Sequence, residues 1–382
     1  MKVTISVIKA DVGSIGGHTK PSYAMLNAVD SNIESAIINS QLLLDGITSF
    51  TGDDIALVMS HNKGVGSKEI HGFAWNTFLE ATQIAKDYGL YGAGQDLLVD
   101  APSGNIRGAG PAVAEIEFDL LPNYRQAEAF LVFGADKCAP GAYSVALWNT
   151  FCNPMHNGGL LLSPKLLKGF TVTVIDMDHK SQDSDRVVTI NTAEEHGSIK
   201  LAALLRNMDR FAVESVHSNA HPNEQIVSLS ATRLHNIAGK YTGKDDPVMI
   251  FRTQGIFPAP EEVVSPYNIC PYITGDCRGS HVMALMPMAL NTPVRGNYCQ
   301  PIVSCTAFSM DKDGYFTDEL VDVFDGQEWN VAREKALTKS NFMREQGCFG
   351  VAMASEPELA YTGLVEIMKS MESRFEIRKN IT

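Results

Sequence analysis

The N-terminal part of the chain combines short apolar runs with longer stretches of helical spacing. Residues 4–8 (TISVI) have the length and β-branched composition of a strand. The runs GITSF and IALVMS are joined by TGDD, which predicts a hairpin with Gly52 in its turn. Residues 72–89 predict an amphipathic helix that ends at Gly89. An earlier helix is predicted after Pro21, where apolar residues recur at three- and four-residue steps: Met25, Leu26, Val29, Ile33, Ala36 and Ile37.

The middle of the chain adds strand-like runs that follow one another more often than they alternate with helices. They occupy residues 113–121, 128–136, 170–178, 211–218, 225–231 and 247–252. This order favours a sandwich of sheets covered by helices over a doubly wound parallel fold. In the C-terminal part, residues 357–375 predict one good helix. Because no repeat or Pro/Ser-rich linker divides the chain, we predict a single α/β domain over residues 1–382.

Composition narrows the class of protein. The 382 residues are 45% hydrophobic and 20% charged, which is ordinary for a globular chain. No apolar run approaches the roughly 18 residues of a membrane span, and no secretory signal is recognisable, so we expect a cytoplasmic protein. A net charge of −13 argues against a nucleic-acid surface. The seven cysteines include no C-x-x-C pair and the histidines no H-E-x-x-H pattern, which disfavours disulfide frameworks and zinc sites.

Several acidic residues stand at the ends of the predicted strands. Asp11 follows the first run, and His18 lies seven residues further on across a glycine-rich loop. Taken alone, this pair is better explained by a strand-end aspartate that caps a turn. Asp53 and Asp54 occupy the hairpin tip, where adjacent carboxylates repel each other unless a cation lies between them. An Asx turn with a solvated second aspartate explains these two residues equally well.

Two further segments could contact phosphate groups. Asp136 and Lys137 end the run at 128–136, where they could hold a metal and a phosphate or form an ordinary surface ion pair. The glycine-rich segment 91–111 would let backbone N–H groups approach a phosphate, although an ordinary long loop explains it better on its own. It contains neither a P-loop nor a G-x-G-x-x-G that opens a helix, so no nucleotide site is predicted.

The segment YTGKDD, residues 241–246, repeats the acidic tip and adds a lysine. Lys244 forms a Schiff base only as the free amine, whereas adjacent Asp245 and Asp246 favour the charged ammonium. Divalent cations on both aspartates would remove this conflict, because their charge disfavours a nearby ammonium. Tyr241 could then transfer a proton, and Arg278 could contact a second phosphate. The whole set favours an anionic, phosphate-bearing substrate bound through divalent metals.

These motifs resemble one family in order and spacing. They are KADVGSIGGH, TGDD, YGAGQDLL, SGNIRGAGP, ADKCAPGAY, AGKYTGKDDPVM, RGSH-x4-MP and PELAYT. The chain resembles the fructose-1,6-bisphosphate aldolase/phosphatases, bifunctional gluconeogenic enzymes of archaea and deeply branching bacteria, from about residue 3 to residue 365. The resemblance implies a compact four-layer α-β-β-α sandwich, a homo-octamer, several Mg²⁺ ions per active site, and triose phosphates and fructose 1,6-bisphosphate as substrates.

The resemblance also implies roles for individual residues. The metals would be held by Asp11, His18, Asp53, Asp54, Gln95, Asp136, Asp245 and Asp246. The substrate would be contacted by His18, Tyr91, Gly104, Asn105, Lys137, Gln254, Arg278 and Tyr361, the last from a C-terminal segment (about 340–382) that closes over the site. Lys244 would form the Schiff base with dihydroxyacetone phosphate, and Tyr241 would be the aldolase acid/base. Asp11 would act as the base on water in the phosphatase step.

One segment departs from the family pattern. Beyond MP the family has an aspartate in an FDGPP-like segment, whereas this chain reads VRGNYCQPIV with Asn297 nearest that place, so no residue is assigned there. Two other functions remain open at this point. One is a Mg²⁺-dependent sugar-bisphosphate phosphatase in which Lys244 only binds phosphate, and the other is a catalytically silent oligomer stabilised by Mg²⁺.

Overall fold

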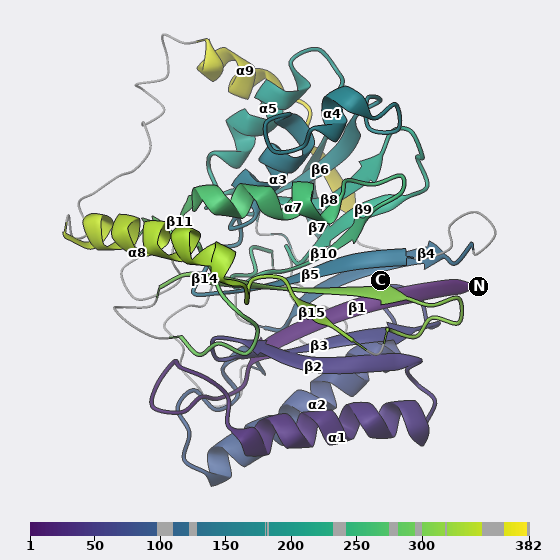
Figure 1. The fold of residues 1–382 in the computed structure, drawn as a ribbon, viewed down its shortest axis with the longest axis vertical. Helices are drawn as coiled ribbons and strands as arrows, with labels where there is room; N and C mark the ends of the chain where they lie inside the picture. Colours follow the sequence, from purple (N-terminus) through teal and green to yellow (C-terminus); the bar gives the residue numbers. More distant parts are fainter. Residues whose placement is uncertain are drawn as a thin grey trace.

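The computed structural model shows a mixed α/β fold with several sheets and helices on their outer faces (Figure 1). It describes residues 1–97, 110–121, 128–179, 181, 183–231, 242–274, 282–294, 300–317, 319–345 and 363–379. Within these ranges, no helix has the length and apolar character needed to cross a membrane.

The smaller sheet has the strand order β2-β3-β1-β4, with all pairs antiparallel. Its strands are β1 (Lys2–Asp11), β2 (Asp45–Thr51), β3 (Asp54–His61) and β4 (Ala112–Asp119). The predicted hairpin is confirmed, and Gly52 has the positive φ of 60° that its turn requires. One face of this sheet is covered by α1 (Tyr23–Ile38) and α2 (Lys68–Asp87), as Figure 1 shows.

Both predicted N-terminal helices are confirmed. In α1 the side chains of Met25, Val29, Ile33 and Ala36 are buried, as their three- and four-residue spacing predicts. Helix α2 begins earlier than predicted, because Ser67 caps it by accepting a hydrogen bond from the Ile70 N–H. Gly89, at a φ of 66°, follows its last turn.

The larger sheet has the strand order β13-β14-β5-β10-β9-β8-β6-β7-β16, with β15 paired to β14. In chain order its strands are β5 (Glu128–Asp136), β6 (Phe170–Asp176), β7 (Ser184–Asn191), β8 (Phe211–Ser218), β9 (Gln225–Leu229), β10 (Val248–Thr253), β13 (Met286–Pro287), β14 (Ile302–Met310), β15 (Val321–Asp322) and β16 (Glu376–Lys379). Strands β11 (Tyr272–Thr274) and β12 (Val282–Ala284) form a separate pair. Among the described strands only β13 and β14 pair in parallel, so the preference against a doubly wound fold is confirmed.

Helices pack on the outer face of the larger sheet (Figure 1). They include α3 (Ser144–Cys152), α4 (Gly159–Leu162), α5 (Gly197–Leu205), α7 (Pro260–Val264), α8 (Asn330–Glu345) and α9 (Leu364–Glu372). The 3₁₀ turns are η1 (Gln95–Leu97), η2 (Ser265–Ile269) and η3 (Gln327–Trp329). Helix α9 confirms the helix predicted at residues 357–375 over the part of that segment that is described, but the prediction of only one good helix in the C-terminal part was wrong, because α8 was missed. Its buried positions are the small residues Ala332, Ala336 and Ser340 and one large residue, Met343, so no continuous stripe of large apolar residues marks it.

The apolar core between the two sheets leads directly to the charged residues of the site. Val3, Ile5 and Val7 of β1 pack in this core against residues of β5 and β10. Alternation along the strand places Lys9 and Asp11 on the same face. The inter-sheet space therefore changes from apolar to charged along one strand. A separate core fills the space between the smaller sheet and α1 and α2, and a larger one lies under the outer helices.

Candidate active site and metal centre

The predicted acidic residues meet where strands from both sheets end or begin. Asp11 ends β1 and is the antiparallel partner of Asp54, the first residue of β3. Asp136 ends β5 in the other sheet, and Asp246 lies two residues before β10, the antiparallel neighbour of β5. All four side chains are buried. The sequence therefore correctly identified strand-end aspartates that the fold brings together.

The hairpin tip of the smaller sheet touches the larger sheet. The backbone N–H of Asp53 donates to Asp136 Oδ2 at 3.2 Å. A Cβ atom at Gly52 would lie 1.5 Å from the same oxygen, so no side chain fits there without moving Asp136. Glycine is thus required at this position by the contact between the two sheets as well as by its positive φ.

The backbone at the end of β5 is joined to the segment before β10. Cys138 N–H donates to Asp246 Oδ1 at 2.7 Å, and Asp246 N–H donates to the Cys138 carbonyl at 2.9 Å. Lys137 and Asp246 both have positive φ, 61° and 45°, which is uncommon for residues other than glycine. Such conformations persist where surrounding bonds hold them, and they concentrate at functional sites.

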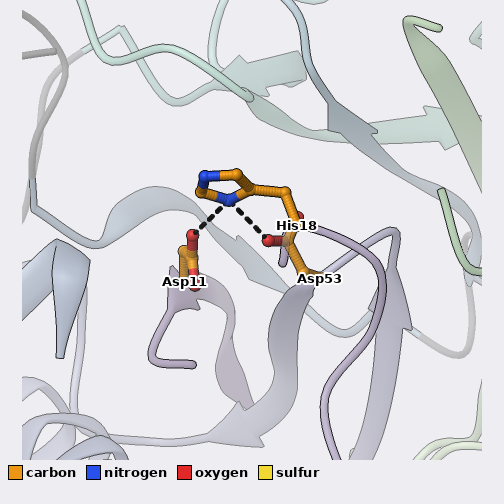
Figure 2. Close-up of side chains that lie close together, drawn as sticks. All are labelled: Asp11, His18 and Asp53. Carbon is orange, nitrogen blue, oxygen red and sulfur yellow. Dashed lines mark hydrogen bonds and ion pairs between the residues drawn. The ribbon is translucent and has the colours of Figure 1, made fainter. Parts of the chain in front are cut away.

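Two groups of side chains have the spacing of metal ligands. In the first, His18 Nδ1 lies 3.0 Å from Asp53 Oδ2 and 3.8 Å from Asp11 Oδ2, and Figure 2 shows the ring nitrogen facing both carboxylates. The second comprises Asp53, Asp54 and Asp136, and within each group the ligand atoms lie within 4.8 Å of one another. Asp53 belongs to both groups, so the two positions share a ligand.

Three buried lysines are interleaved with these carboxylates. Lys137 donates to Asp53 and, at 2.7 Å, to Asp136, while Lys9 donates to Asp54. Lys244 donates to Asp245 at 2.9 Å. Against these three ammonium groups stand seven buried carboxylates, a formal excess of four negative charges: Asp11, Asp53, Asp54, Asp96, Asp136, Asp245 and Asp246. Buried charge of one sign is unfavourable unless cations or protons compensate it.

Protons compensate part of this charge when no metal is bound. Burial and the nearby Asp53 and Asp54 raise the pKa of Asp11 well above its usual range. Burial also raises the pKa of Asp136, against the effect of Lys137. For Asp246, burial and neighbouring carboxylates raise the pKa to about 6. Burial alone would raise the pKa of Asp53, but the Lys137 ammonium and the His18 hydrogen bond outweigh it and lower that pKa.

Lys244 is held as an ammonium by its neighbours. Burial alone would lower its pKa, but Asp245 and Asp96 outweigh burial and raise the pKa well above the ordinary value for lysine. This agrees with the inference that the carboxylates next to Lys244 oppose formation of the free amine. A nucleophilic role for Lys244 therefore requires a change in charge around it, such as the binding of a cation by these aspartates.

Two residues of the cluster were missed in the sequence. Lys9 is fully buried on β1 beneath Asp54, and Asp96 in η1 lies 3.4 Å from Lys244 Nζ. Burial raises the pKa of Asp96 to about 7, against the effect of Lys244. A lysine at the end of an apolar strand is ordinarily taken as exposed, and Asp96 follows Gln95, the residue of this segment to which the resemblance assigns a metal. The alternation along β1 was the available signal, because it places Lys9 on the face of Asp11.

The other residues predicted for the site lie beside the cluster, far from it, or outside the described residues. Tyr91 lies beside His18, with ring centroids 4.9 Å apart, and Gln95 begins η1 next to Asp96. Gln254 follows the far end of β10, roughly 20 Å or more along the strand from Asp246, and its side chain is exposed. The structure therefore does not bring Gln254 into the cluster within one chain. Outside the described residues lie Gly104, Asn105, Tyr241, Arg278, Asn297 and Tyr361.

Comparison with known proteins agrees with this geometry. A family model described as fructose-1,6-bisphosphatase matches residues 2–376. The chain belongs to this family. A relative from Thermus thermophilus, named fructose-1,6-bisphosphate aldolase/phosphatase, is 47% identical over 98% of this chain and 100% of its own length. Relatives with the same name from Cenarchaeum symbiosum and Ignicoccus hospitalis are 42% and 37% identical, over 94% and 100% of this chain and 91% and 94% of theirs.

For a member of the fructose-1,6-bisphosphatase family, the two ligand groups suit a metal cofactor. They offer carboxylate oxygens and one imidazole nitrogen within a short distance of each other. Hard divalent cations prefer oxygen ligands of this kind. The excess negative charge and the raised pKa values of Asp11 and Asp136 are what such a site shows when no cation is bound. The residues present therefore fit a divalent metal.

Proposed function

We propose that this chain is a bifunctional fructose-1,6-bisphosphate aldolase/phosphatase acting in gluconeogenesis. One observation carries the proposal: the amine of Lys244 is buried in the same cluster as the carboxylates of both ligand groups. An amine nucleophile and a metal centre in one site can serve two successive reactions on one sugar phosphate. The names of the relatives support this assignment.

In the proposed aldolase reaction, Lys244 acts as the nucleophile. Its neutral amine attacks the carbonyl carbon of dihydroxyacetone phosphate, and loss of water gives an iminium ion. Loss of a proton from the adjacent carbon forms an enamine, which attacks the aldehyde carbon of glyceraldehyde 3-phosphate. Hydrolysis then releases fructose 1,6-bisphosphate and restores the amine. The proton transfers are assigned to Tyr241, which lies outside the described residues.

In the proposed phosphatase reaction, water attacks the C1 phosphate of fructose 1,6-bisphosphate and releases fructose 6-phosphate. Asp11 accepts the proton of the attacking water, and the ammonium of Lys137 stabilises negative charge on the phosphate. When bound, Mg²⁺ supplies Lewis-acid polarisation of the phosphate oxygens. Several Mg²⁺ ions would be held by Asp11, His18, Asp53, Asp54, Gln95, Asp136, Asp245 and Asp246.

The proposal extends to the domain arrangement, the oligomeric state and the C-terminal segment of the chain. We propose a single domain over residues 1–382 arranged as a four-layer α-β-β-α sandwich, which the succession of three apolar cores supports. The family resemblance supports a cytoplasmic homo-octamer. It also supports a C-terminal segment, about 340–382, that closes over the site and carries Tyr361.

Trapping of the imine tests the function. Borohydride is added to the protein with dihydroxyacetone phosphate and Mg²⁺, and the modified peptide is mapped by mass spectrometry. We expect a reduced adduct on Lys244, no adduct there in Lys244→Arg, and Mg²⁺-dependent phosphate release from fructose 1,6-bisphosphate. Phosphate release without an adduct would leave a phosphatase that lacks the aldolase reaction. Absence of both would exclude the proposed enzyme.

A further inference from the structure

Asp96 connects the parts of the site assigned to the two reactions. Its Oδ2 accepts a hydrogen bond from the backbone N–H of Asp11 at 2.9 Å. The two carboxylate oxygens each lie 3.4 Å from Lys244 Nζ. The backbone N–H of Gly110 donates to Oδ1 at 3.3 Å. One buried side chain thus contacts both the backbone of the assigned phosphatase base and the assigned Schiff-base lysine.

The backbone around Asp96 is fixed to the end of β1. Ser14 and Tyr91 exchange backbone hydrogen bonds of 2.9 and 3.0 Å, and Gly94 N–H donates to the Val12 carbonyl at 3.1 Å. The turn η1 begins at the next residue. Because these bonds attach residues 91–97 to β1, Asp96 keeps its place relative to Asp11. A carboxylate held in this way can orient a flexible lysine side chain.

We propose that Asp96 is a positioning residue shared by both reactions, which orients the amine of Lys244 and fixes the backbone of Asp11. This inference rests on the proposed function, because it takes the roles of Lys244 and Asp11 from it. Asp96 forms no covalent bond with substrate. Its contribution is a charge-assisted contact with the amine and a hydrogen bond to the strand end.

Asp96→Asn separates the two contacts. Its amide oxygen can still accept from the Asp11 N–H, but the negative charge facing Lys244 is lost, and the NH₂ group in place of Oδ1 no longer accepts from the Gly110 N–H. The rate of borohydride trapping is measured at one high pH and constant Mg²⁺ over a range of dihydroxyacetone phosphate concentrations. We expect the maximal rate to fall roughly tenfold in Asp96→Asn, because the orientation of the amine is lost. The concentration for half-maximal trapping should stay near the wild-type value, because a positioning residue acts on the amine and not on the substrate.

Further variants distinguish positioning from a general effect on folding. Asp96→Ala removes both contacts, so phosphate release should fall more in this variant than in Asp96→Asn. Asp96→Glu keeps the charge and should trap faster than Asp96→Asn. Asp87→Asn, an exposed change on α2, is the matched control and should behave as wild type. Denaturant unfolding of each variant confirms that the compared proteins are folded.

Two results would overturn the inference. The first is an unchanged maximal rate of trapping in Asp96→Asn, or a change confined to the half-maximal concentration, and the second is slower trapping by Asp96→Glu than by Asp96→Asn. Absence of an adduct on Lys244 in the wild-type protein is a different result, because it would contradict the proposed function before Asp96 is considered. The two failures are therefore distinguishable in one set of measurements.

Discussion

Two of the ionic clusters among the described residues differ in the number of cations that face their buried aspartates. Beneath α9, Asp176 accepts hydrogen bonds from Arg210 at 3.0 and 2.9 Å and from Arg186, and both arginines also reach Glu372. We call these four residues the α9 anchor. Its one buried carboxylate has two guanidinium partners, whereas the site sets three ammonium groups against seven buried carboxylates.

The protonation of the two clusters follows from this difference. In the α9 anchor, burial would raise the pKa of Asp176, but Arg210 and Arg186 outweigh burial and lower it. In the site, the pKa values of Asp11 and Asp136 are raised. In the α9 anchor, residues of the chain itself balance the charge of the buried carboxylate. In the site, the charge balance requires cations or protons from solution. An uncompensated excess of buried charge therefore distinguishes a functional cluster from a structural one.

Removing a lysine from the site should produce the largest change. In Lys9→Met, Asp54 loses the ammonium beneath it, and removing one partner of a buried pair costs about 3–5 kcal/mol of unfolding free energy. Urea unfolding without Mg²⁺ measures this loss, and Mg²⁺ should restore part of it. Lys2→Met, on the same strand, is the control: Lys2 is exposed in its pair with half-buried Glu117, so the free energy of unfolding should stay close to the wild-type value. Equal losses in both variants would contradict the comparison.

Removing a carboxylate from the site should affect activity more than stability. In Asp136→Asn we expect kcat/KM for phosphate release to fall by about 100-fold or more, since even outer-shell partners of a metal contribute 10- to 100-fold. The Mg²⁺ concentration for half-maximal activity should rise. Asp30→Asn, on the exposed face of α1, serves as the control. Wild-type Mg²⁺ dependence in Asp136→Asn would exclude this residue as a ligand.

The carboxylates of the site whose pKa is raised and Asp176 of the α9 anchor should respond to pH in opposite directions. In the site, the folded pKa values of about 6 for Asp246 and about 7 for Asp96 exceed the ordinary 3.8. Their contribution to the free energy of unfolding is therefore full below about pH 4 and is lost as pH rises toward 7. The slope is ~1.4 kcal/mol per pH unit for each proton that the folded protein binds and the unfolded chain does not. Asp176 has a lowered pKa, so its contribution is present above 3.8 and is lost as pH falls. Urea unfolding with chelator should show the decline toward pH 7, and Mg²⁺ should remove it. A chelated sample whose stability rises between pH 4 and pH 7 as steeply as the Mg²⁺-loaded sample would contradict the assignment.

The smallest effect should come from the α9 anchor. Arg210 is partly exposed, so Arg210→Met should lower the free energy of unfolding by only about 1 kcal/mol. The Mg²⁺ concentration for half-maximal phosphate release should not change, because the anchor has no role in the site. Thermal unfolding and a Mg²⁺ titration of activity check both statements. A shifted titration would show that the two clusters are coupled.

Much of the fold was predictable because most elements carry a regular apolar pattern. The apolar runs of β5 and β8 and the helical spacing of α1 identified these elements with few errors at their ends. Helix α8 was missed because, apart from Met343, it buries only alanine and serine and so has no strong apolar stripe. Strand β7 was not assigned, since its sequence begins with polar residues that read as a loop.

Residues of the site could be predicted where they belong to a recognisable sequence motif. Aspartates at strand ends could be identified singly, and the fold brings Asp11, Asp54 and Asp136 together. The sequence could not show that Lys9 and Asp96 join them, because their burial depends on how two sheets dock. Nor could it show that Gln254 lies at the opposite end of β10 from Asp246. The distance between these two residues depends on the length and direction of the strand between them, which a motif does not give.

The position of the site at the junction of two sheets has a consequence for how the molecule is made. Its carboxylates come from residues as far apart in sequence as Asp11 and Asp246, so the chain must close long loops before they meet. A divalent ion therefore finds no preformed site in the unfolded chain, and we expect it to leave the rate of folding unchanged. Once the sheets have docked, a bound ion stabilises only the finished form. The concentration of the free divalent ion should then determine how slowly the folded protein unfolds, whereas the chain alone determines how quickly it folds.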